Sequence, residues 1–241
     1  MNILVTGGNS GLGRATVNQL AKEGHKVYFS YLPSEQCTQE ANEMVKADDN
    51  LVAMPLNFCD KISVDDFCSH INGWEIDVLV NSAYAGKAQG THFYKTPADD
   101  YLVAFENNVI PTIRITQTCL EGMRKRKYGK IINIITSYVI DTPPIGMSIY
   151  TATKAYLRQI SRSISKEFGK FNITSNCLLP EYMNTNFGKV EDFQLEQMKA
   201  AHPLKRLLTP EEVAQVIVNF VNSSQQLNGI EMPINAAQHI M

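Results

Sequence analysis

Two side chains that could share one proton-transfer task stand four residues apart in Tyr150-Thr151-Ala152-Thr153-Lys154. On a helix this spacing places the Tyr150 phenol and the Lys154 ammonium on one face, one turn apart. A fixed positive charge within about 4–6 Å favours the phenolate and lowers a tyrosine pKa from its usual value of about 10. The pair therefore predicts a general acid or base with its own tuning charge, although these five residues alone also fit an ordinary solvated surface pair.

A second chemical signal lies near the start of the chain, in Thr6-Gly7-Gly8-Asn9-Ser10-Gly11-Leu12-Gly13. The segment follows an expected strand and precedes an expected helix. Glycines allow a tight turn and let backbone N–H groups approach a pyrophosphate at a helix N-terminus, where the macrodipole favours negative charge. In this context the glycine-rich loop predicts a dinucleotide site.

The elements that must position these motifs alternate along the chain. Apolar, β-branched runs predict strands at Asn2–Thr6, Lys26–Tyr31, Leu51–Leu56, Ile76–Asn81, Lys130–Thr136, Ile173–Leu179 and Ile230–Ile234. Helical patterns cover Gly11–Glu23, Glu35–Ala47, Ser63–Asn72, Ala98–Lys127, Ile149–Phe168 and Pro210–Asn222. This alternation predicts a parallel sheet with crossover helices, and nearly continuous apolar strands indicate that helices cover both faces. We expect an α/β fold: a single doubly wound, Rossmann-type domain over residues 1–241, with a mainly parallel sheet of about seven strands.

The segment 184–205 is less regular than its surroundings. Its mixed polarity and its position after the sixth expected strand predict a loop-and-helix flap over the carboxyl ends of the strands. The helix that follows opens with Thr209-Pro210-Glu211-Glu212, an N-cap followed by proline at the first helical position.

Composition argues against several classes of protein. Lys and Arg number 22 against 24 Asp and Glu, and a net charge of −2 gives no electrostatic signature of binding to nucleic acid or an anionic membrane. The basic run Met123–Lys127 is expected to end a helix. Five cysteines, scattered and without metal-ligand spacing, predict neither a disulfide framework nor a metal site and fit a reducing, cytoplasmic compartment. The chain starts without a signal-peptide pattern, and no apolar run reaches the roughly 18 residues of a spanning helix, so we expect a soluble protein.

The glycine-rich loop and the Tyr-x-x-x-Lys pattern together make the whole chain resemble the short-chain dehydrogenase/reductase family. The family's further motifs also follow in order between these two. Asn81-Ser82-Ala83-Tyr84 ends the fourth expected strand, Asn108 lies in the long helix, and Ser137 precedes Tyr150 by 13 residues. The resemblance implies an NAD(P)-dependent oxidoreductase that interconverts a carbonyl and a secondary alcohol by hydride transfer. It also implies a reductase of a small or carrier-linked keto substrate, similar to the 3-oxoacyl-carrier-protein reductases.

The resemblance implies a role for each matched catalytic residue. Tyr150 would act as general acid, and Lys154 would lower its pKa and bind the nicotinamide ribose. Ser137 would donate a hydrogen bond to the substrate oxygen, with Thr136 as a competing candidate. Asn108 would anchor a proton relay from Lys154 to solvent, although Asn107 leaves the register open.

Cofactor contacts carry over in the same way, from the phosphates to the nicotinamide. The implied residues are Gly7, Asn9, Ser10, Gly11, Leu12, Gly13, Ser30, Tyr31, Asn57, Phe58, Asn81, Ala83, Tyr150, Lys154, Pro180, Met183 and Thr185. The end of the second expected strand, Ser30-Tyr31-Leu32, supplies neither the carboxylate that binds a ribose 2′-hydroxyl nor the arginine that meets a 2′-phosphate. Because Arg14, Ser30 or Ser34 could approach a 2′-phosphate, we favour NADP(H) over NAD(H).

Some positions depart from the family pattern. Ser82 and Tyr84 replace an Asn and a Gly, Glu181 follows Pro180 where Gly is usual, and Ala236-Ala237 stand where a glycine pair is common. Tyr84 is expected at the mouth of the substrate pocket and Glu181 near the nicotinamide.

Two alternative functions stay open. A halohydrin-dehalogenase-like lyase shares the fold but loses the glycine-rich loop and has Arg in place of Lys154, and a nucleotide-sensing regulator would be expected to lose a catalytic residue. The family also implies a homotetramer or dimer packed through Ala98–Lys127 and Ile149–Phe168.

Overall fold

A seven-stranded parallel sheet forms the centre of the computed structural model, which describes residues 1–241 except 88–89, 186, 188–189 and 239–241. The strands are β1 (Asn2–Val5), β2 (Lys26–Tyr31), β3 (Leu51–Pro55), β4 (Val78–Asn81), β5 (Gly129–Ile134), β6 (Ile173–Pro180) and β7 (Glu231–Ile234). Their order is β3-β2-β1-β4-β5-β6-β7, and every neighbouring pair is parallel. The chain winds outward from β1 in one direction and from β4 in the other, so the topological switch point lies between these two strands.

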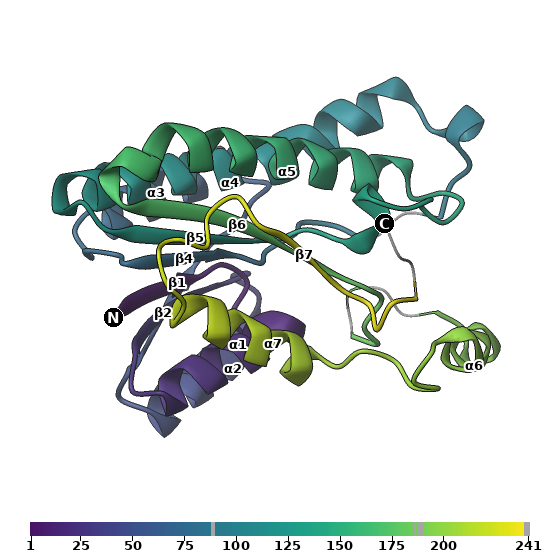
Figure 1. The fold of residues 1–241 in the computed structure, drawn as a ribbon, viewed down its shortest axis with the longest axis horizontal. Coiled ribbons are helices and arrows are strands. Elements are labelled where there is room, and N and C mark those ends of the chain that lie inside the picture. The colour runs from purple at the N-terminus through teal and green to yellow at the C-terminus, as the bar shows by residue number, and fades with distance from the viewer. Residues whose placement is uncertain (88–89, 186, 188–189, 239–241) are drawn as a thin grey trace.

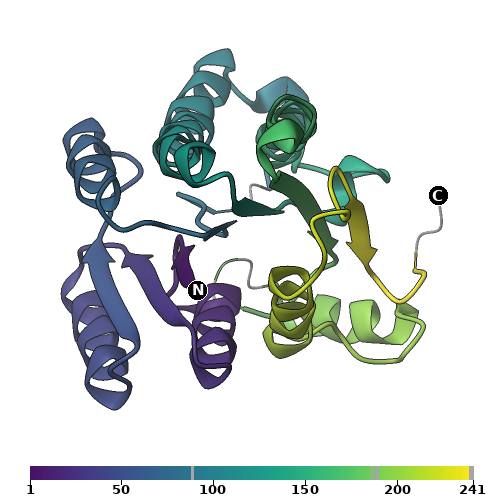
Figure 2. The same ribbon diagram turned by 60° about the vertical axis from the view of Figure 1, so that its left-hand side comes forward.

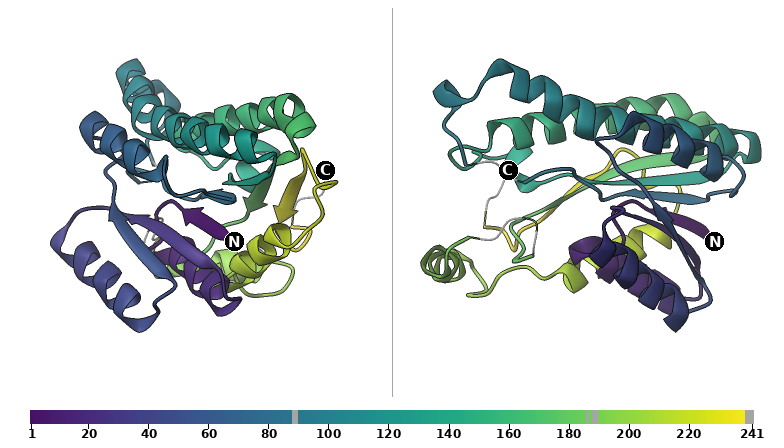
Figure 3. Two further views of the ribbon diagram at one scale, coloured as in Figure 1. Left: turned by 90° about the vertical axis from the view of Figure 1, so that its left-hand side faces the viewer. Right: turned by 180° about the vertical axis from the view of Figure 1, so that it is seen from behind.

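Helices cover both faces of the sheet (Figures 1 and 3). One face carries α1 (Gly11–Lys22), α2 (Glu35–Ala47) and α7 (Pro210–Val221). The other carries α3 (Lys61–Ile71), α4 (Ala98–Arg126) and α5 (Ser148–Phe168). The remaining α-helix of the described chain, α6 (Asp192–Ala201), extends beyond the end of the layers in Figure 1 and lies at the level of the α7 layer in Figure 2. Single 3-10 turns occur at Phe93–Lys95, Ser137–Val139 and Gly169–Phe171.

The apolar core is divided by the sheet. Alternate residues of a strand point to opposite faces, so Leu4 packs in the cluster with α3 and α4 while Ile3 and Val5 pack in the cluster with α1 and α7. A third cluster joins the ends of β5 and β6 to α4 and α5. Because both faces are covered, β4, β5 and β6 are buried along their whole length, which is why their sequence lacks an alternating pattern.

The predicted doubly wound α/β fold is confirmed, and the sheet is wholly rather than mainly parallel. Element boundaries fall within about two residues of expectation, as at β4, which begins at Val78 instead of Ile76. The helix α7 begins with a reciprocal capping box, in which Thr209 and Glu212 each bind the other's backbone N–H.

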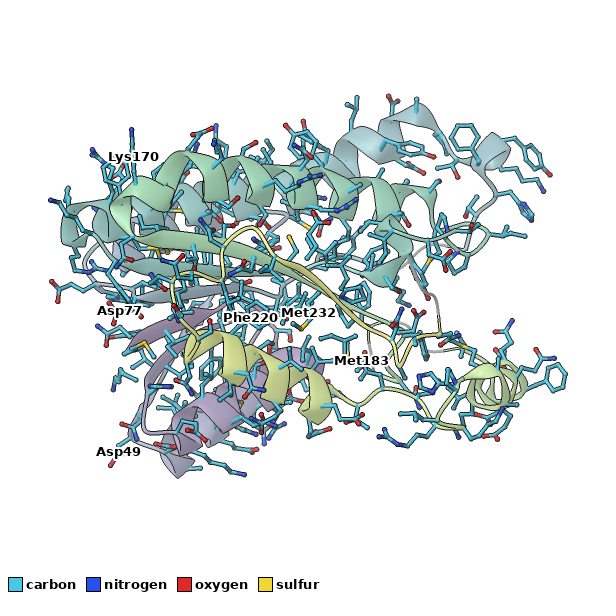
Figure 4. The ribbon with its side chains drawn as sticks, in the orientation of Figure 1. Asp49, Asp77, Lys170, Met183, Phe220 and Met232 are labelled. Carbon is cyan, nitrogen blue, oxygen red and sulfur yellow. The ribbon has the colours of Figure 1, made fainter. Side chains whose placement is uncertain are left out.

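The carboxyl ends of the strands lie at one edge of the sheet. In Figure 4, Met183 lies toward this edge, whereas Asp49 and Asp77 lie at the opposite edge, where β3 and β4 begin. None of the helices in the described part of the chain combines the length and apolar character needed to cross a membrane. Nor do the described His, Cys, Asp and Glu side chains form a cluster of three or more that could hold a metal ion.

Candidate active site

The glycine-rich loop is pressed against β2. The Gly7 N–H donates to the Ser30 hydroxyl at 2.9 Å, and the Gly8 N–H donates to the Ser30 carbonyl at 2.8 Å. A Cβ at Gly8 would lie 2.5 Å from the Cβ of Phe29, and one at Gly13 would lie 2.0 Å from the Gly7 carbonyl oxygen. The loop can follow this path only with glycine at both positions.

The same loop is tied to the end of β4 through Thr6. Its hydroxyl accepts the N–H groups of Ser82 and Ala83 at 3.0 and 3.1 Å. Gly7 has a φ of +70°, and a Cβ there would lie 3.1 Å from the Cα of Ala83. Thr6 therefore holds together the two strand ends that flank the switch point.

The N-terminus of α1 fits the pyrophosphate of a dinucleotide. Its N-cap residue Ser10 makes no side-chain capping bond among the described residues, and its first turn carries no acidic residue. The first backbone N–H groups of this helix, those of Gly11, Leu12 and Gly13, follow a loop in which the positions of Gly8 and Gly13 leave no room for a Cβ atom. Such a cradle is the geometry in which helix N-termini bind phosphate.

Side chains near the end of β2 have structural partners. Ser30 is buried and its hydroxyl binds Gly7, while the Ser34 side chain caps α2 by accepting the Cys37 N–H. Buried Asn9 donates to the Glu40 carboxylate at 3.3 Å. Of the three groups expected to approach a 2′-phosphate, Arg14 alone is both exposed and free of such a structural role in the described chain.

The expected adenine-side residues lie at the ends of β3 and β4. The Asn57 side chain accepts the Cys59 N–H at 3.0 Å and so shapes the turn after β3, while Phe58 is buried against α3. Asn81 points its amide into the sheet, donating to Asn133 at 2.9 Å and to Thr116 at 3.1 Å. Tyr31 packs beside the α1 and α2 core.

Tyr150 lies in the first turn of α5 among aromatic rings. Its ring centroid is 5.1 Å from that of Tyr84 and 5.8 Å from that of Phe187. Burial, and then its neighbours Tyr84 and Tyr138, raise the pKa of the Tyr150 phenol, while a hydrogen bond with the Thr136 side chain lowers it. The expected lowering is therefore not found, and Tyr150 is held in its protonated form at neutral pH.

Lys154 lies one turn further along α5 and is buried. Its Nζ donates to the Ile134 carbonyl oxygen at 2.8 Å and lies 5.9 Å from the Tyr150 ring centroid. Burial lowers the pKa of Lys154 to about 8. The loss of hydration opposes the lysine charge more than the facing Cys177 supports it, and the amine still carries its proton at neutral pH.

Ser137 and Thr136 have different partners. The Ser137 hydroxyl, which is fully buried, donates to Glu181 Oε2 at 2.7 Å. Thr136 instead lies against the Tyr150 phenol. Both residues therefore contact groups of the candidate site, Ser137 through Glu181 and Thr136 through Tyr150.

Asn108 ties the long helix to the loop after β4. It is buried, whereas Asn107 is half-buried. Its side-chain oxygen accepts the Ala85 N–H at 2.7 Å, and its amide donates to the Ala85 carbonyl at 3.2 Å. Asn108 therefore positions the backbone next to Tyr84.

The segment after β6 brings the two motifs together. Thr185 lies beside Gly11, with its side-chain carbons 3.6 and 3.7 Å from where a Gly11 Cβ would stand. Met183 pairs with Leu208 in a β-bridge and packs on the α1 side of the core, following buried Pro180. Phe187 reaches Tyr84 at 5.4 Å between ring centroids. Within the expected flap, positions 186 and 188–189 lie outside the described residues.

Sequence reasoning had no place for Phe187 in the site. It is an isolated aromatic residue in an irregular stretch, with no motif around it. The only available signal was its spacing of six residues from Glu181, which is too general to identify a contact.

Comparison with known proteins agrees with this geometry. Residues 7–235 match the family model described as enoyl-(acyl carrier protein) reductase. The chain is 30% identical to the 3-oxoacyl-(acyl-carrier-protein) reductase FabG of Aquifex aeolicus, over 89% of this chain and 87% of the relative. It is 28% identical to the acetoacetyl-CoA reductase of Cupriavidus necator, over 98% and 97% of the two chains.

A solved structure described as a short chain dehydrogenase/reductase family protein superposes with a TM-score of 0.82 at 27% identity, covering 98% of this chain and 96% of that one. The curated relatives above are named as reductases, which disfavours both the dehalogenase-like lyase and the regulator. The chain belongs to the short-chain dehydrogenase/reductase family of NAD(P)-dependent oxidoreductases.

Proposed function

We propose that the protein is a carbonyl reductase in which Tyr150 is the general acid, acting with NADP(H) in preference to NAD(H). The observation that carries this proposal is the meeting of the glycine cradle with the Tyr150–Lys154 face at one edge of the sheet, where Thr185 lies beside Gly11. The domain that builds this edge is proposed to be a single dinucleotide-binding unit over residues 1–241.

A bound reduced nicotinamide supplies the hydride that adds to the carbonyl carbon. Tyr150 transfers its phenolic proton to the oxygen of the former carbonyl, which becomes the alcohol hydroxyl, and Thr136 hydrogen-bonds the phenol. The raised phenol pKa keeps the proton on Tyr150 at neutral pH, and the negative charge that develops on the former carbonyl oxygen would draw this proton across. Lys154 would hold the nicotinamide ribose, and Asn108 is proposed to support the relay that returns a proton from solvent.

The substrate class is proposed from the relatives. The names of two of them specify acyl-carrier-protein-linked and CoA-linked keto substrates. We extend this to a small or carrier-linked keto compound here. We further propose a cytoplasmic location, since all five cysteines of the described structure are free thiols, and a homo-oligomeric state.

Cofactor choice can be tested by binding alone. A ligand that binds only the folded state raises the melting temperature, so NADPH and NADH are compared at equal concentrations in a thermal shift assay. Exposed Arg14 at the start of α1 supports a larger shift with NADPH. Absence of a shift with either nucleotide would overturn the proposed function.

The acid is tested with Tyr150→Phe, which removes the phenolic oxygen and keeps the ring packed against Tyr84 and Phe187. We expect kcat to fall by at least about 100-fold, the usual contribution of a positioned acid, with cofactor affinity retained. Stopped-flow oxidation of NADPH with a ketone panel measures kcat, and fluorescence titration with the cofactor measures its affinity. Normal turnover in this variant would exclude Tyr150 as the acid.

A further inference from the structure

Glu181 places a carboxylate against the buried serine of the site. The Ser137 hydroxyl donates its proton to Glu181 Oε2 at 2.7 Å. A serine hydroxyl carries one proton, so Ser137 in this pairing offers only lone pairs to a further partner. The usual donation from this serine to a substrate oxygen competes with a charged acceptor that is already in place.

The backbone of Glu181 is fixed, because its N–H donates to the Ile234 carbonyl on β7 at 3.1 Å. Its charge acts on the neighbouring pocket wall: burial and then the Glu181 carboxylate raise the pKa of Tyr138 to about 12. Among the described residues, none of the ion pairs includes Glu181. Within the described chain the half-buried Glu181 carboxylate therefore has Ser137 as a hydrogen-bond donor and no ion-pair partner.

Aromatic rings pack around Tyr150. Tyr84, Tyr150 and Phe187 contact one another pairwise, with centroid separations of 5.1, 5.4 and 5.8 Å. The faces of aromatic rings attract cations, and the Lys154 ammonium already lies 5.5 Å from the Tyr84 centroid. Aromatic faces together with a carboxylate that lacks an ion-pair partner are the chemistry that recognises an organic ammonium group.

We infer that Glu181 is a specificity-determining residue that selects ketones carrying a nitrogen cation next to the reacting carbonyl and repels keto acids. This inference rests on the proposed function and narrows its substrate class. The cation faces the Glu181 carboxylate while the carbonyl oxygen faces the Tyr150 phenol. An anionic substituent in the same position meets a like charge, so keto acids bind more weakly.

Three probes of similar size separate charge from shape. They are the acetonyltrimethylammonium cation, its uncharged carbon isostere methyl neopentyl ketone, and anionic acetoacetate. The wild-type enzyme is compared with Glu181→Gln, which removes the charge and keeps the side-chain size. Because intrinsic reactivity cancels when each probe is compared between the two enzymes, the ratio of kcat/KM values reports the charge contribution.

We expect the cation-to-isostere ratio to fall at least about tenfold in Glu181→Gln and the acetoacetate-to-isostere ratio to rise. Calorimetry should show that Glu181→Gln binds the cation probe more weakly than the wild-type enzyme does. The control is Glu191→Gln, an exposed glutamate at the N-cap of α6 that makes no side-chain capping bond in the described chain, and its ratios should match wild type.

Two failures can be told apart. If the wild-type enzyme oxidises NADPH with the neutral isostere but Glu181→Gln leaves both ratios within about twofold of wild type, the specificity inference is wrong while the proposed function stands. If the wild-type enzyme reduces none of the probes and binds neither NADPH nor NADH, the proposed function itself fails.

Discussion

Lys154 carries its charge in surroundings that oppose it. The side chain is 4% exposed, its ammonium has the Ile134 carbonyl as hydrogen-bond acceptor, and burial lowers its pKa to about 8. In the folded protein the amine is therefore protonated below this pH and loses its proton as the pH rises through it. The proposed contact of Lys154 with the ribose hydroxyls would favour the protonated form, so we expect cofactor binding and protonation of Lys154 to be linked.

This linkage predicts how cofactor affinity depends on pH. The affinity for NADPH should be highest below about pH 8 and should fall by up to about tenfold per unit at higher pH, because binding then requires uptake of a proton. Fluorescence titrations across this range measure the effect. In Lys154→Arg the guanidinium stays charged, so its affinity should be nearly independent of pH. A wild-type affinity that does not change with pH would contradict the prediction.

The sequence predicted candidate site residues but not their contacts. Tyr150 and Lys154 were predicted from helical spacing, and Ser137 from the motif order of the family that the chain resembles. The bond from Ser137 to Glu181 joins residues 44 positions apart, and the ring contacts of Phe187 depend on how the chain leaves β6. Side-chain direction after a strand is set by tertiary packing, which periodicity does not encode.

At the scale of the element, a buried lysine on β5 donates hydrogen bonds to the C-terminal end of a helix that covers the sheet. Lys130 is 4% exposed, and its Nζ donates to the carbonyl oxygens of Phe220 and Val221 at 3.3 and 2.7 Å, and also to that of Ser223. These carbonyls lie at the C-terminus of α7, where acceptors lack intrahelical donors and the macrodipole favours a cation. Lys130 therefore joins the sheet to α7.

Replacing Lys130 with methionine keeps the apolar stem and removes all three hydrogen bonds. We expect Lys130→Met to lower the free energy of unfolding by about 2–4 kcal/mol, because buried carbonyls lose their donor. Urea denaturation followed by circular dichroism measures the change. The control Lys125→Met lies in the exposed last turn of α4 and should stay within about 0.5 kcal/mol of wild type. Equal stability of the two variants would show that Lys130 makes no net contribution.

Helices and strands were predictable from the sequence because their signals are local. The helix α2 and the strand β2 have the expected limits, and the proline at the start of α7 marks its first residue. Helix α6 was expected only as part of an irregular flap, since it has no buried residue and so no apolar stripe to reveal it. Its existence depends on local contacts that leave a weak pattern.

At the scale of the whole molecule, the outer surface of α4 and α5 exposes apolar side chains. Leu102 and Val103 are 63% and 53% exposed, Ile110 is 40% exposed, and Tyr156 on α5 is 45% exposed. Val103 and Ile110 stand two helical turns apart and so share one stripe of α4. An apolar stripe beside a second long helix favours association with another copy through these two helices, as in a symmetric dimer.

This arrangement predicts an oligomer that a charge would dissociate. In multi-angle light scattering the wild-type protein should have at least twice the monomer mass. The double variant Val103→Glu/Ile110→Glu should approach the monomer mass, because desolvating two carboxylates in an apolar interface is unfavourable. The control Ile62→Glu places one such carboxylate on α3, where Ile62 is 79% exposed, and should remain oligomeric. A monomeric wild-type protein would exclude this interface. Dissociation by the control alone would place the interface elsewhere.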